Sequence, residues 1–179
     1  MRGERENGDA VFSRIDVSNG RVIVSVIDGL GHGPHAAAAA AVASAQLDEE
    51  MHCESAVEIL RRMNDRLRGT RGVAATVCVL TEHALSACGV GNVSLRSCGT
   101  PVPFVLSPGI LGSRVHRFRE VNARLQPGDR LLLHSDGISS GFSLDAVKHL
   151  GADAACQFVF DAYRKVTDDA TVLVMDLAR

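Results

Sequence analysis

A glycine-rich loop between an apolar strand and an alanine-rich helix constrains the fold more than any other feature of the sequence. The loop, Asp28–Gly33, follows the apolar run Val22–Ile27. Pro34 then begins a helix at its first position, where a proline leaves no hydrogen bond unmade, and Ala36–Leu47 continues it. Because alanine side chains are small, we expect this helix to lie close to a sheet. Asp28 therefore stands where a buried strand ends and a tightly held loop begins.

The strand before this loop is expected to form a hairpin with the segment Asp9–Val17. Asn19-Gly20, between two strand-like runs, is the strongest short-range signal for such a turn. A two-residue loop would place Val11 opposite Asp28, with Asp9 as the diagonal neighbour of Asp28 on the same face, ~7–8 Å away at Cα. The rest of that face is mostly apolar and is expected to be core: Val11, Ser13, Ile15, Val17, Val22, Val24 and Val26. Two carboxylates at this spacing can reach a common ion.

The remaining pattern lacks the regular strand–helix alternation of a parallel sheet. A helix is expected at 56–68, with Ser55 and Glu58 as a capping box and Gly69 as its end. Strands are expected at 73–80, 83–88, 93–98, 102–106, 115–121, 130–135 and 171–177, and helices at 144–150 and 153–165. This order predicts an α+β fold with antiparallel sheets and helices packed outside. Residues 1–179 are expected to form a single domain.

Composition excludes several classes of protein. The formal net charge of -2, one tyrosine and no tryptophan argue against a nucleic-acid binder, which needs basic patches and stacking aromatic rings. No apolar run reaches the ~18 residues of a membrane span, and no signal peptide is visible. The five cysteines are an odd number without a C-x-x-C pair, which disfavours a disulfide framework or a structural zinc site. A cytoplasmic location is therefore expected.

Further aspartates stand at the ends of apolar strands. Asp136 follows the segment RLLLHS, and Asp168 and Asp169 precede TVLVMDL. Each alone can be a turn residue or a cap. Together with Asp9 and Asp28 they also suit a divalent cation, which favours oxygen ligands and offsets the repulsion between neighbouring carboxylates. The residue pattern by itself leaves both interpretations open.

Four runs make the metal interpretation more specific. They are NGDAVF at Asn7–Phe12, VIDGLGHGPHAA at Val26–Ala37, HSDGIS at His134–Ser139 and DDATVLV at Asp168–Val174. In this order they resemble the motifs of the metal-dependent protein serine/threonine phosphatases (PPM family), and Gly89–Asn92 is typical of the bacterial SpoIIE-like branch. The resemblance covers nearly the whole chain. The short chain with GLGHGP after its aspartate resembles the feedback phosphatases of the bacterial stressosome.

The resemblance implies an α-β-β-α sandwich with two Mn²⁺ or Mg²⁺ ions between the sheets. Asp28 would bridge both ions, and the Gly29 carbonyl would bind one of them. Asp9 would hold that ion directly or through water, while Asp136 and Asp168 would hold the other; Asp169 is a reserve candidate. The ions would activate a water that attacks phosphoserine or phosphothreonine in line. The substrate would be a phosphorylated stressosome scaffold protein.

The chain departs from the larger, eukaryotic-type members of this family near its start. They carry a phosphate-binding arginine ahead of the first acid, and neither Arg2 nor Arg5 matches that position well. Many members also have a strand before that acid, whereas eight residues precede Asp9 here. Substrate choice would then rest with the surface around the metals. The exposed face of the second helix, with Arg61, Arg62 and Arg66, is a candidate docking or regulatory surface or simply a solvated face.

Other functions are compatible with some of these residues. Gly31–Ala36 fits the G-x-G-x-x-A fingerprint of dinucleotide sites, but a hairpin precedes it and no strand ending in an acid follows. His32, His35 and His134 could form a zinc site, or His32 or His134 a general acid. A pseudophosphatase that binds phosphoproteins without turnover is the remaining alternative, although all the expected acids are present.

Overall fold

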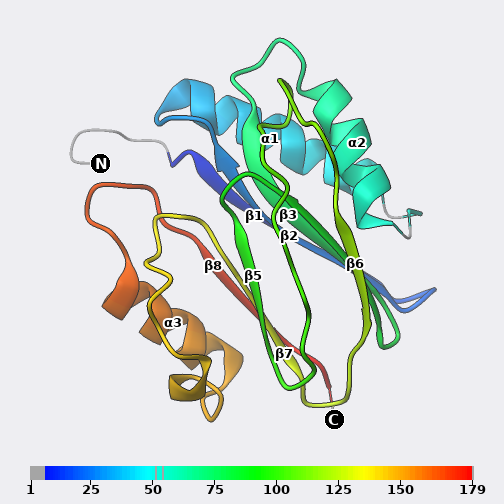
Figure 1. Cartoon of the computed structure of the whole chain (residues 1–179), viewed down its shortest axis with the longest axis vertical. Coiled ribbons are helices and arrows are strands. Elements are labelled where there is room, and N and C mark those ends of the chain that lie inside the picture. The colour runs from blue at the N-terminus through cyan, green and yellow to red at the C-terminus, as the bar shows by residue number, and fades with distance from the viewer. Residues whose placement is uncertain (1–6, 51, 54, 179) are drawn as a thin grey trace.

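The protein forms two antiparallel sheets and three α-helices in the part of the chain that the structure, a computed structural model, describes, residues 7–50, 52–53 and 55–178 (Figure 1). One sheet has the strand order β1 (Asp9–Asp16), β2 (Arg21–Gly29), β3 (Val73–Thr81), β4 (Ala84–Val90) and β6 (Glu120–Arg124). The other has the order β5 (Ser94–Cys98), β7 (Arg130–His134) and β8 (Val172–Asp176). The helices are α1 (Pro34–Glu49), α2 (Ala56–Arg66) and α3 (Ala152–Tyr163).

Three apolar clusters define the layers. The first, with Ile27, Leu47 and Leu60, lies between α1, α2 and the five-stranded sheet. The second, with Val26 and Leu133, lies between the two sheets, and a third joins the three-stranded sheet to α3. The order of layers is therefore helix, sheet, sheet, helix, which confirms the expected α+β sandwich. No helix of the described residues has the length and apolar character needed to cross a membrane.

The expected strand at 102–106 is wrong, and so are parts of two other predicted elements. Residues 101–118 pass along the sandwich with isolated bridges such as Val90–Ser107 and Val73–Leu111, and β6 begins only at Glu120. Pro101 and Pro103 explain this, because proline has no N–H to give to a strand ladder. The helix expected at 144–150 is a short 3₁₀ turn, Leu144–Ala146.

The predicted register of the β1–β2 hairpin is wrong by two residues. Asp16 pairs with Arg21, so the connection has four residues, and Asp9 lies directly opposite Asp28. The longer turn is held by side chains: the Asp16 carboxylate accepts hydrogen bonds from Ser18, and Asn19 accepts one from the Arg21 N–H. Because a shift of two residues keeps every side chain on its face, the two carboxylates still share a face and are closer than predicted.

The expectation that the whole inner face of this hairpin is core is also wrong. Val24 and Val26 are buried between the sheets, but Val11 is 48% and Ile15 is 64% exposed. β1 is the edge of the wider sheet, and the cluster between the sheets takes no buried residue from it. The narrower three-stranded sheet covers β2, β3 and β4 and leaves β1 open.

Candidate active site

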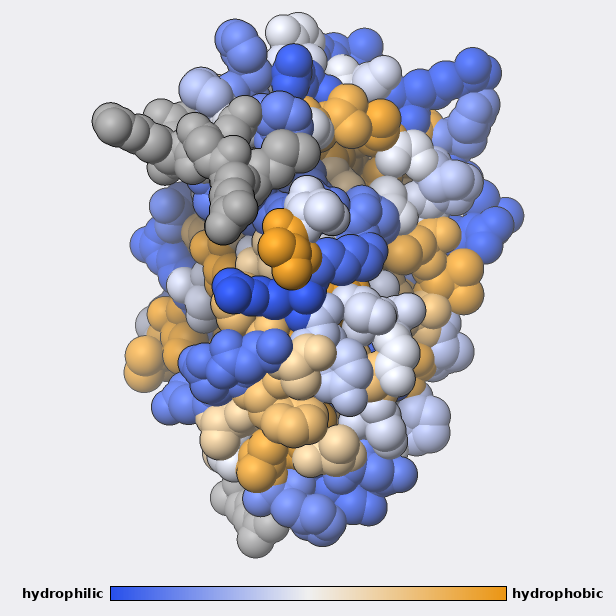
Figure 2. Space-filling model, turned by 90° about the vertical axis from the view of Figure 1, so that its left-hand side faces the viewer, coloured by the Kyte–Doolittle hydropathy of each residue, from blue (hydrophilic) through white to orange (hydrophobic). Residues whose placement is uncertain are grey.

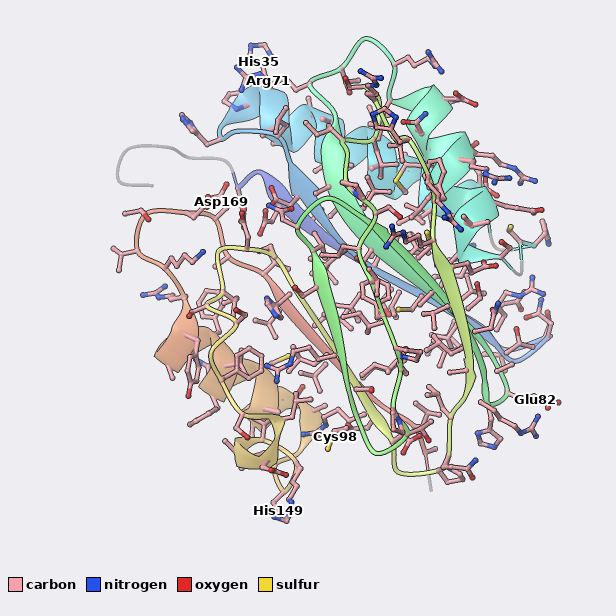
Figure 3. The ribbon with its side chains drawn as sticks, in the orientation of Figure 1. His35, Arg71, Glu82, Cys98, His149 and Asp169 are labelled. Carbon is pink, nitrogen blue, oxygen red and sulfur yellow. The ribbon has the colours of Figure 1, made fainter. Side chains whose placement is uncertain are left out.

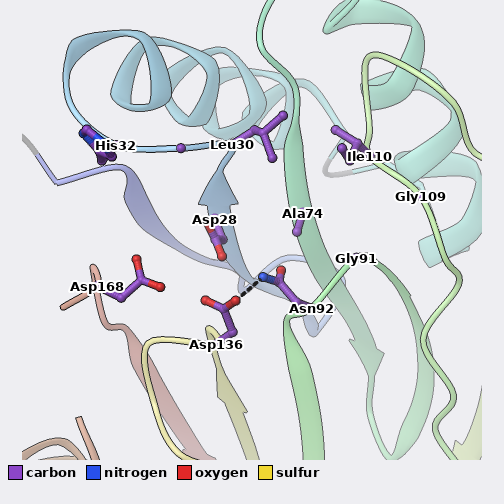
Figure 4. Close-up of a pocket in the computed structure, with 11 residues that line it drawn as sticks. Asp28, Leu30, His32, Ala74, Gly91, Asn92, Gly109, Ile110, Asp136 and Asp168 are labelled. Carbon is purple, nitrogen blue, oxygen red and sulfur yellow. Dashed lines mark hydrogen bonds between the residues drawn. The ribbon is translucent and has the colours of Figure 1, made fainter. Parts of the chain in front are cut away.

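A pocket of about 410 Å³ opens where the glycine-rich loop meets the ends of both sheets. It is lined by Asp28, Leu30, Gly31, His32, Ala74, Gly91, Asn92, Gly109, Ile110, Asp136 and Asp168. In Figure 4 the carboxylates of Asp28, Asp136 and Asp168 gather on one side, whereas Leu30 and Ile110 lie on the other. The pocket thus has an acidic half and an apolar half.

Strand geometry brings these aspartates together. Asp28 is the penultimate residue of β2, and the first residue of β1, Asp9, is its cross-strand partner. In the other sheet, β7 and β8 are antiparallel and pair His134 with Val172. The end of β7 and the start of β8 therefore lie side by side. Asp136, just after β7, and Asp168, just before β8, thus come to the same edge and line the pocket with Asp28. Four of the predicted site residues are assembled from both sheets at one end of the sandwich.

Asp9 lies beside the pocket rather than on its wall and connects the two sheets. Its Oδ2 accepts a hydrogen bond of 2.7 Å from the hydroxyl of Ser135, and Ser135 Oγ in turn accepts the Thr171 N–H at 3.0 Å. Burial raises the pKa of the Asp9 carboxyl above its usual value, and the Ser135 hydrogen bond opposes that rise. Ser135 therefore fixes the carboxylate of the first strand against the ends of β7 and β8.

Asp169, the reserve candidate, does not line the pocket. Its carboxylate accepts the N–H of Gly8 at 2.7 Å, and Gly8 in turn accepts the N–H of Gly29 at 3.0 Å. Figure 3 shows Asp169 beside the start of the first strand. Gly29 is required for packing, since a Cβ there would lie 2.4 Å from the Ala36 carbonyl oxygen of α1. Asp169 thus holds the backbone that carries Asp9 and Gly29.

Asp136 has a side-chain partner that sequence reasoning did not name as a site residue. The Asn92 amide donates to Asp136 Oδ2 at 2.7 Å (Figure 4). Its place in the Gly89–Asn92 motif was the available signal. Ser135 and Thr171 were also missed, although each adjoins a predicted acidic motif. Gly137, next to Asp136, is needed because a Cβ there would clash with the Asp169 carbonyl oxygen.

The electrostatics of the pocket indicate uncompensated negative charge. Burial, with the charges of Asp9 and Asp136 next in importance, raises the pKa of Asp28 to about 7. Oxygen donors of this kind suit Mg²⁺ or Mn²⁺, which are often held by one or two carboxylates with water completing the shell. Within the described residues no group of three His, Cys, Asp or Glu side chains is placed to hold an ion by itself. The donor chemistry fits a divalent cation whose coordination includes water.

The histidines do not form a cluster. His32 lines the pocket, whereas His35 borders a separate cavity beside α1. His134 is buried against the Phe142 ring, with Nδ1 2.9 Å from the Ser135 carbonyl oxygen, and burial lowers its pKa, which favours the neutral ring. The zinc alternative therefore finds no support. The dinucleotide alternative fails on topology, because β2 pairs antiparallel with both neighbours and α1 leads into α2 rather than a parallel strand.

Comparison with known proteins agrees with this geometry. The family model described as Stage II sporulation protein E (SpoIIE) matches residues 18–178. A solved chain described as "The bacterial stressosome: a modular system that has been adapted to control secondary messenger signaling" is 34% identical, with a TM-score of 0.85 over 97% of this chain and 93% of that one. No curated protein sequence gives a significant match.

Two solved structures of lower identity share the fold. RsbX in complex with magnesium is 21% identical, with a TM-score of 0.83 over 97% of this chain and 88% of that one. The catalytic domain of the serine/threonine protein phosphatase PstP in complex with two manganese ions is 17% identical, with a TM-score of 0.73 over 98% of this chain and 94% of that one. The two relatives hold divalent cations of the kinds that the acidic pocket suits.

Proposed function

The chain belongs to the SpoIIE family of PPM-type protein serine/threonine phosphatases, and from this premise we propose that it hydrolyses phosphoserine or phosphothreonine on a stressosome-type scaffold protein in a divalent-metal-dependent reaction. The observation that carries the metal dependence is the acidic half of the pocket. Asp28, Asp136 and Asp168 line it together, and the pKa of Asp28 is raised to about 7. A phosphate dianion would be repelled from such a pocket unless cations stood between it and the carboxylates.

The proposed ligands of two Mn²⁺ or Mg²⁺ ions are Asp28, the Gly29 carbonyl, Asp9, Asp136 and Asp168. Asp28 would be held in common by both ions, because it lies opposite Asp9 in its own sheet and lines the pocket with Asp136 and Asp168. When bound, the ions would supply the positive charge that lowers the pKa of a water and offsets charge on the phosphoryl oxygens. Asp169 enters as a positioning residue, since its carboxylate is already bonded to the Gly8 N–H.

The chain's own residues orient this acidic set and bind the rest of the substrate. Asn92 fixes the carboxylate of Asp136, and Ser135 fixes that of Asp9. Leu30 and Ile110 form the apolar wall, where the hydrocarbon part of a phosphorylated side chain would pack. The Asn92 amide binds Oδ2 of Asp136, which leaves the other oxygen of that carboxylate for a cation.

A cysteine nucleophile is not needed, and the cysteines are unsuited to that role. None of the residues that line the pocket is a cysteine. Burial raises the pKa of Cys78 to about 12 and that of Cys88 to about 11. Because the thiolate is the reactive form, these thiols are inert near neutral pH. The chemistry of the pocket is that of carboxylates.

The scaffold substrate is supported by two likenesses. The description of the 34% identical chain names the bacterial stressosome, and RsbX shares the fold over 97% of this chain. The glycine-rich loop GLGHGP also resembles that of RsbX.

We extend the proposal to the organisation of the chain: residues 1–179 act as one cytoplasmic phosphatase domain. One cooperative thermal unfolding transition is expected, and two separable transitions would contradict the single domain.

The proposal is tested by metal-dependent phosphate release. Protein freed of metal by a chelator should not hydrolyse p-nitrophenyl phosphate, and excess Mn²⁺ should restore turnover. Phosphorylated stressosome scaffold proteins should then lose phosphate as followed by mass. Absence of hydrolysis with Mn²⁺ would sink the enzymatic proposal, while binding of the phosphorylated scaffold without turnover would favour the pseudophosphatase. Turnover of unrelated phosphoproteins but not of scaffolds would remove only the substrate assignment.

A further inference from the structure

A second cavity of about 270 Å³ adjoins the acidic pocket on the side of Asp168. It is lined by Asn7, Phe160, Arg164, Lys165, Val166, Asp168, Asp169 and Ala170, and we name it the basic groove. Asp168 lines both cavities, so they share a wall. On the face of the molecule shown in Figure 2, hydrophilic side chains cover most of the centre. A peptide leaving the acidic pocket on this side would pass over the groove.

The backbone of the groove is fixed to the segment that carries Asp136. The Lys165 N–H donates to the Gly137 carbonyl at 2.7 Å, and a bridge joins Ile138 to Arg164. Figure 1 shows the connection between α3 and β8 running beside the loop after β7. The positions of Arg164 and Lys165 are therefore set relative to the catalytic carboxylates. The groove is preformed rather than an isolated surface loop.

The groove has two cations, Arg164 and Lys165, and two carboxylates, so its net charge is positive when bound metal ions compensate Asp168. The carboxylate of Asp169 accepts the Gly8 N–H, and that of Asp168 is a proposed metal ligand. Arg164 lies over the Phe160 ring, 5.3 Å from its centroid, and Lys165 is exposed. Within the described residues neither cation takes part in an ion pair. Two cationic side chains thus remain for a ligand.

Resting on the proposed function, we propose that Lys165 and Arg164 bind an acidic residue that flanks the phosphorylated serine or threonine of the substrate. A phosphorylated side chain that reaches Asp28 leaves its own backbone at the mouth of the pocket. An extended peptide advances ~3.3 Å per residue, so residues a few positions away lie over the neighbouring groove. The groove therefore gives the enzyme a preference for acidic sequence next to the phosphorylated residue.

The test compares three matched phosphothreonine peptides with the Mn²⁺-loaded enzyme. One has neutral flanks, one has aspartates two to four positions before the phosphothreonine, and one has them two to four positions after it. We expect one acidic peptide to exceed the neutral peptide about fivefold in kcat/KM, mainly through KM. The preference should shrink as salt is added, because exposed charges are screened. The ratio of the kcat/KM values for two peptides, measured on one enzyme preparation, does not depend on the fraction of folded protein.

Charge variants assign the preference to the groove. Lys165→Glu should bring the ratio of kcat/KM for acidic and neutral peptides to one or below, and Lys165→Met should give an intermediate ratio. Arg124→Glu is the matched control and should keep the wild-type ratio, because Arg124, on β6, pairs with Ala84 at the start of β4, away from the acidic end. Equal hydrolysis of all three peptides, or a preference that survives Lys165→Glu, would overturn the groove proposal alone. Hydrolysis of none would overturn the proposed function as well.

Discussion

At one end of the sandwich Arg130 and Asp176 neutralise each other, whereas at the other end Asp9, Asp28, Asp136 and Asp168 gather without an ion pair in the described part of the chain. Arg130, at the start of β7, donates to both oxygens of Asp176 at 2.5 and 2.8 Å. It also donates to the carbonyls of Val147 and Leu150. Figure 3 shows Cys98, the strand partner of Arg130, far from Asp169.

The pKa values record the same contrast. The Arg130 hydrogen bond lowers the pKa of Asp176, while burial and neighbouring carboxylates raise that of Asp28 to about 7. Both ends place charged residues at strand ends in the same fold. A strand-terminal position and burial therefore do not by themselves indicate a functional site. A cluster of like charges without an ion-pair partner does. The following substitutions separate the two roles, beginning with the largest effect.

Replacing Asp28 should abolish most of the activity. Asp28→Asn removes the carboxylate proposed to be shared by both ions, and metal electrostatics contribute several kcal/mol to such reactions, so kcat/KM should fall about 10³-fold. The measurement is Mn²⁺-dependent hydrolysis of p-nitrophenyl phosphate. Asp176→Asn, at the opposite end, should lower Tm but keep the activity of the folded enzyme. Wild-type turnover by Asp28→Asn would contradict the proposed ligand set.

Breaking the balanced end should affect stability instead. Arg130→Met leaves two carbonyls and Asp176 without their donor, so the free energy of unfolding should fall by about 3 kcal/mol. Urea unfolding checks the value, with the exposed Arg124→Met as control. The specific activity of the folded variant should stay within about twofold of wild type, since this end makes no contact with the pocket. A loss of activity without a loss of stability would show that the ends are not independent.

The unbalanced end should make the metal-free protein less stable as the pH rises. Asp28 binds its proton more tightly folded, with a pKa of about 7, than unfolded, with the usual value of 3.8. The folded state then holds more protons between these values, so stability falls as the pH rises through this window. Asp28→Asn should therefore raise the free energy of unfolding by about 2 kcal/mol near pH 8 and by much less near pH 5.

Thermal unfolding in chelator at the two pH values measures this difference. Mn²⁺ should reverse the order near pH 8, stabilising wild type more than the variant, because it binds the ionised carboxylates. If Asp28→Asn raised the free energy of unfolding equally at both pH values, ionisation of the buried Asp28 carboxyl would not be the cause.

The smallest effect is expected at the hydroxyl that connects the sheets. Ser135→Ala removes the hydrogen bond to Asp9 and the acceptor of the Thr171 N–H. The free energy of unfolding should fall by about 1 kcal/mol, and the affinity for Mn²⁺ by about tenfold, because outer-shell partners orient ligands. Calorimetric Mn²⁺ titration measures the affinity, with the exposed Ser139→Ala as control. An unchanged affinity would limit Ser135 to a structural role.

Local pattern was sufficient where neighbouring residues decide the structure. The Ser55 cap of α2 was correctly predicted from sequence, and its hydroxyl accepts the Glu58 N–H. The glycine loop and α1 also formed as expected, and Gly29 is needed there because a Cβ at this position would lie 2.4 Å from the Ala36 carbonyl oxygen. The hairpin register was not predictable from Asn19-Gly20 alone, since Asp16 and Asn19 side chains hold a longer turn.

The sequence by itself determined which chemistry is available: apolar strands that end in aspartate, a glycine-rich loop before a helix, and no C-x-x-C pair. Motif order also determined the family. Tertiary structure decided which acids meet and in what role. It brought Asp28, Asp136 and Asp168 to one pocket and placed the basic groove beside them. It also formed the hydrogen bonds of Asp9 with Ser135 and of Asp169 with Gly8. The hydrogen bonds of Asp9 and Asp169 join residues more than a hundred positions apart, and only sheet pairing and packing bring such residues together.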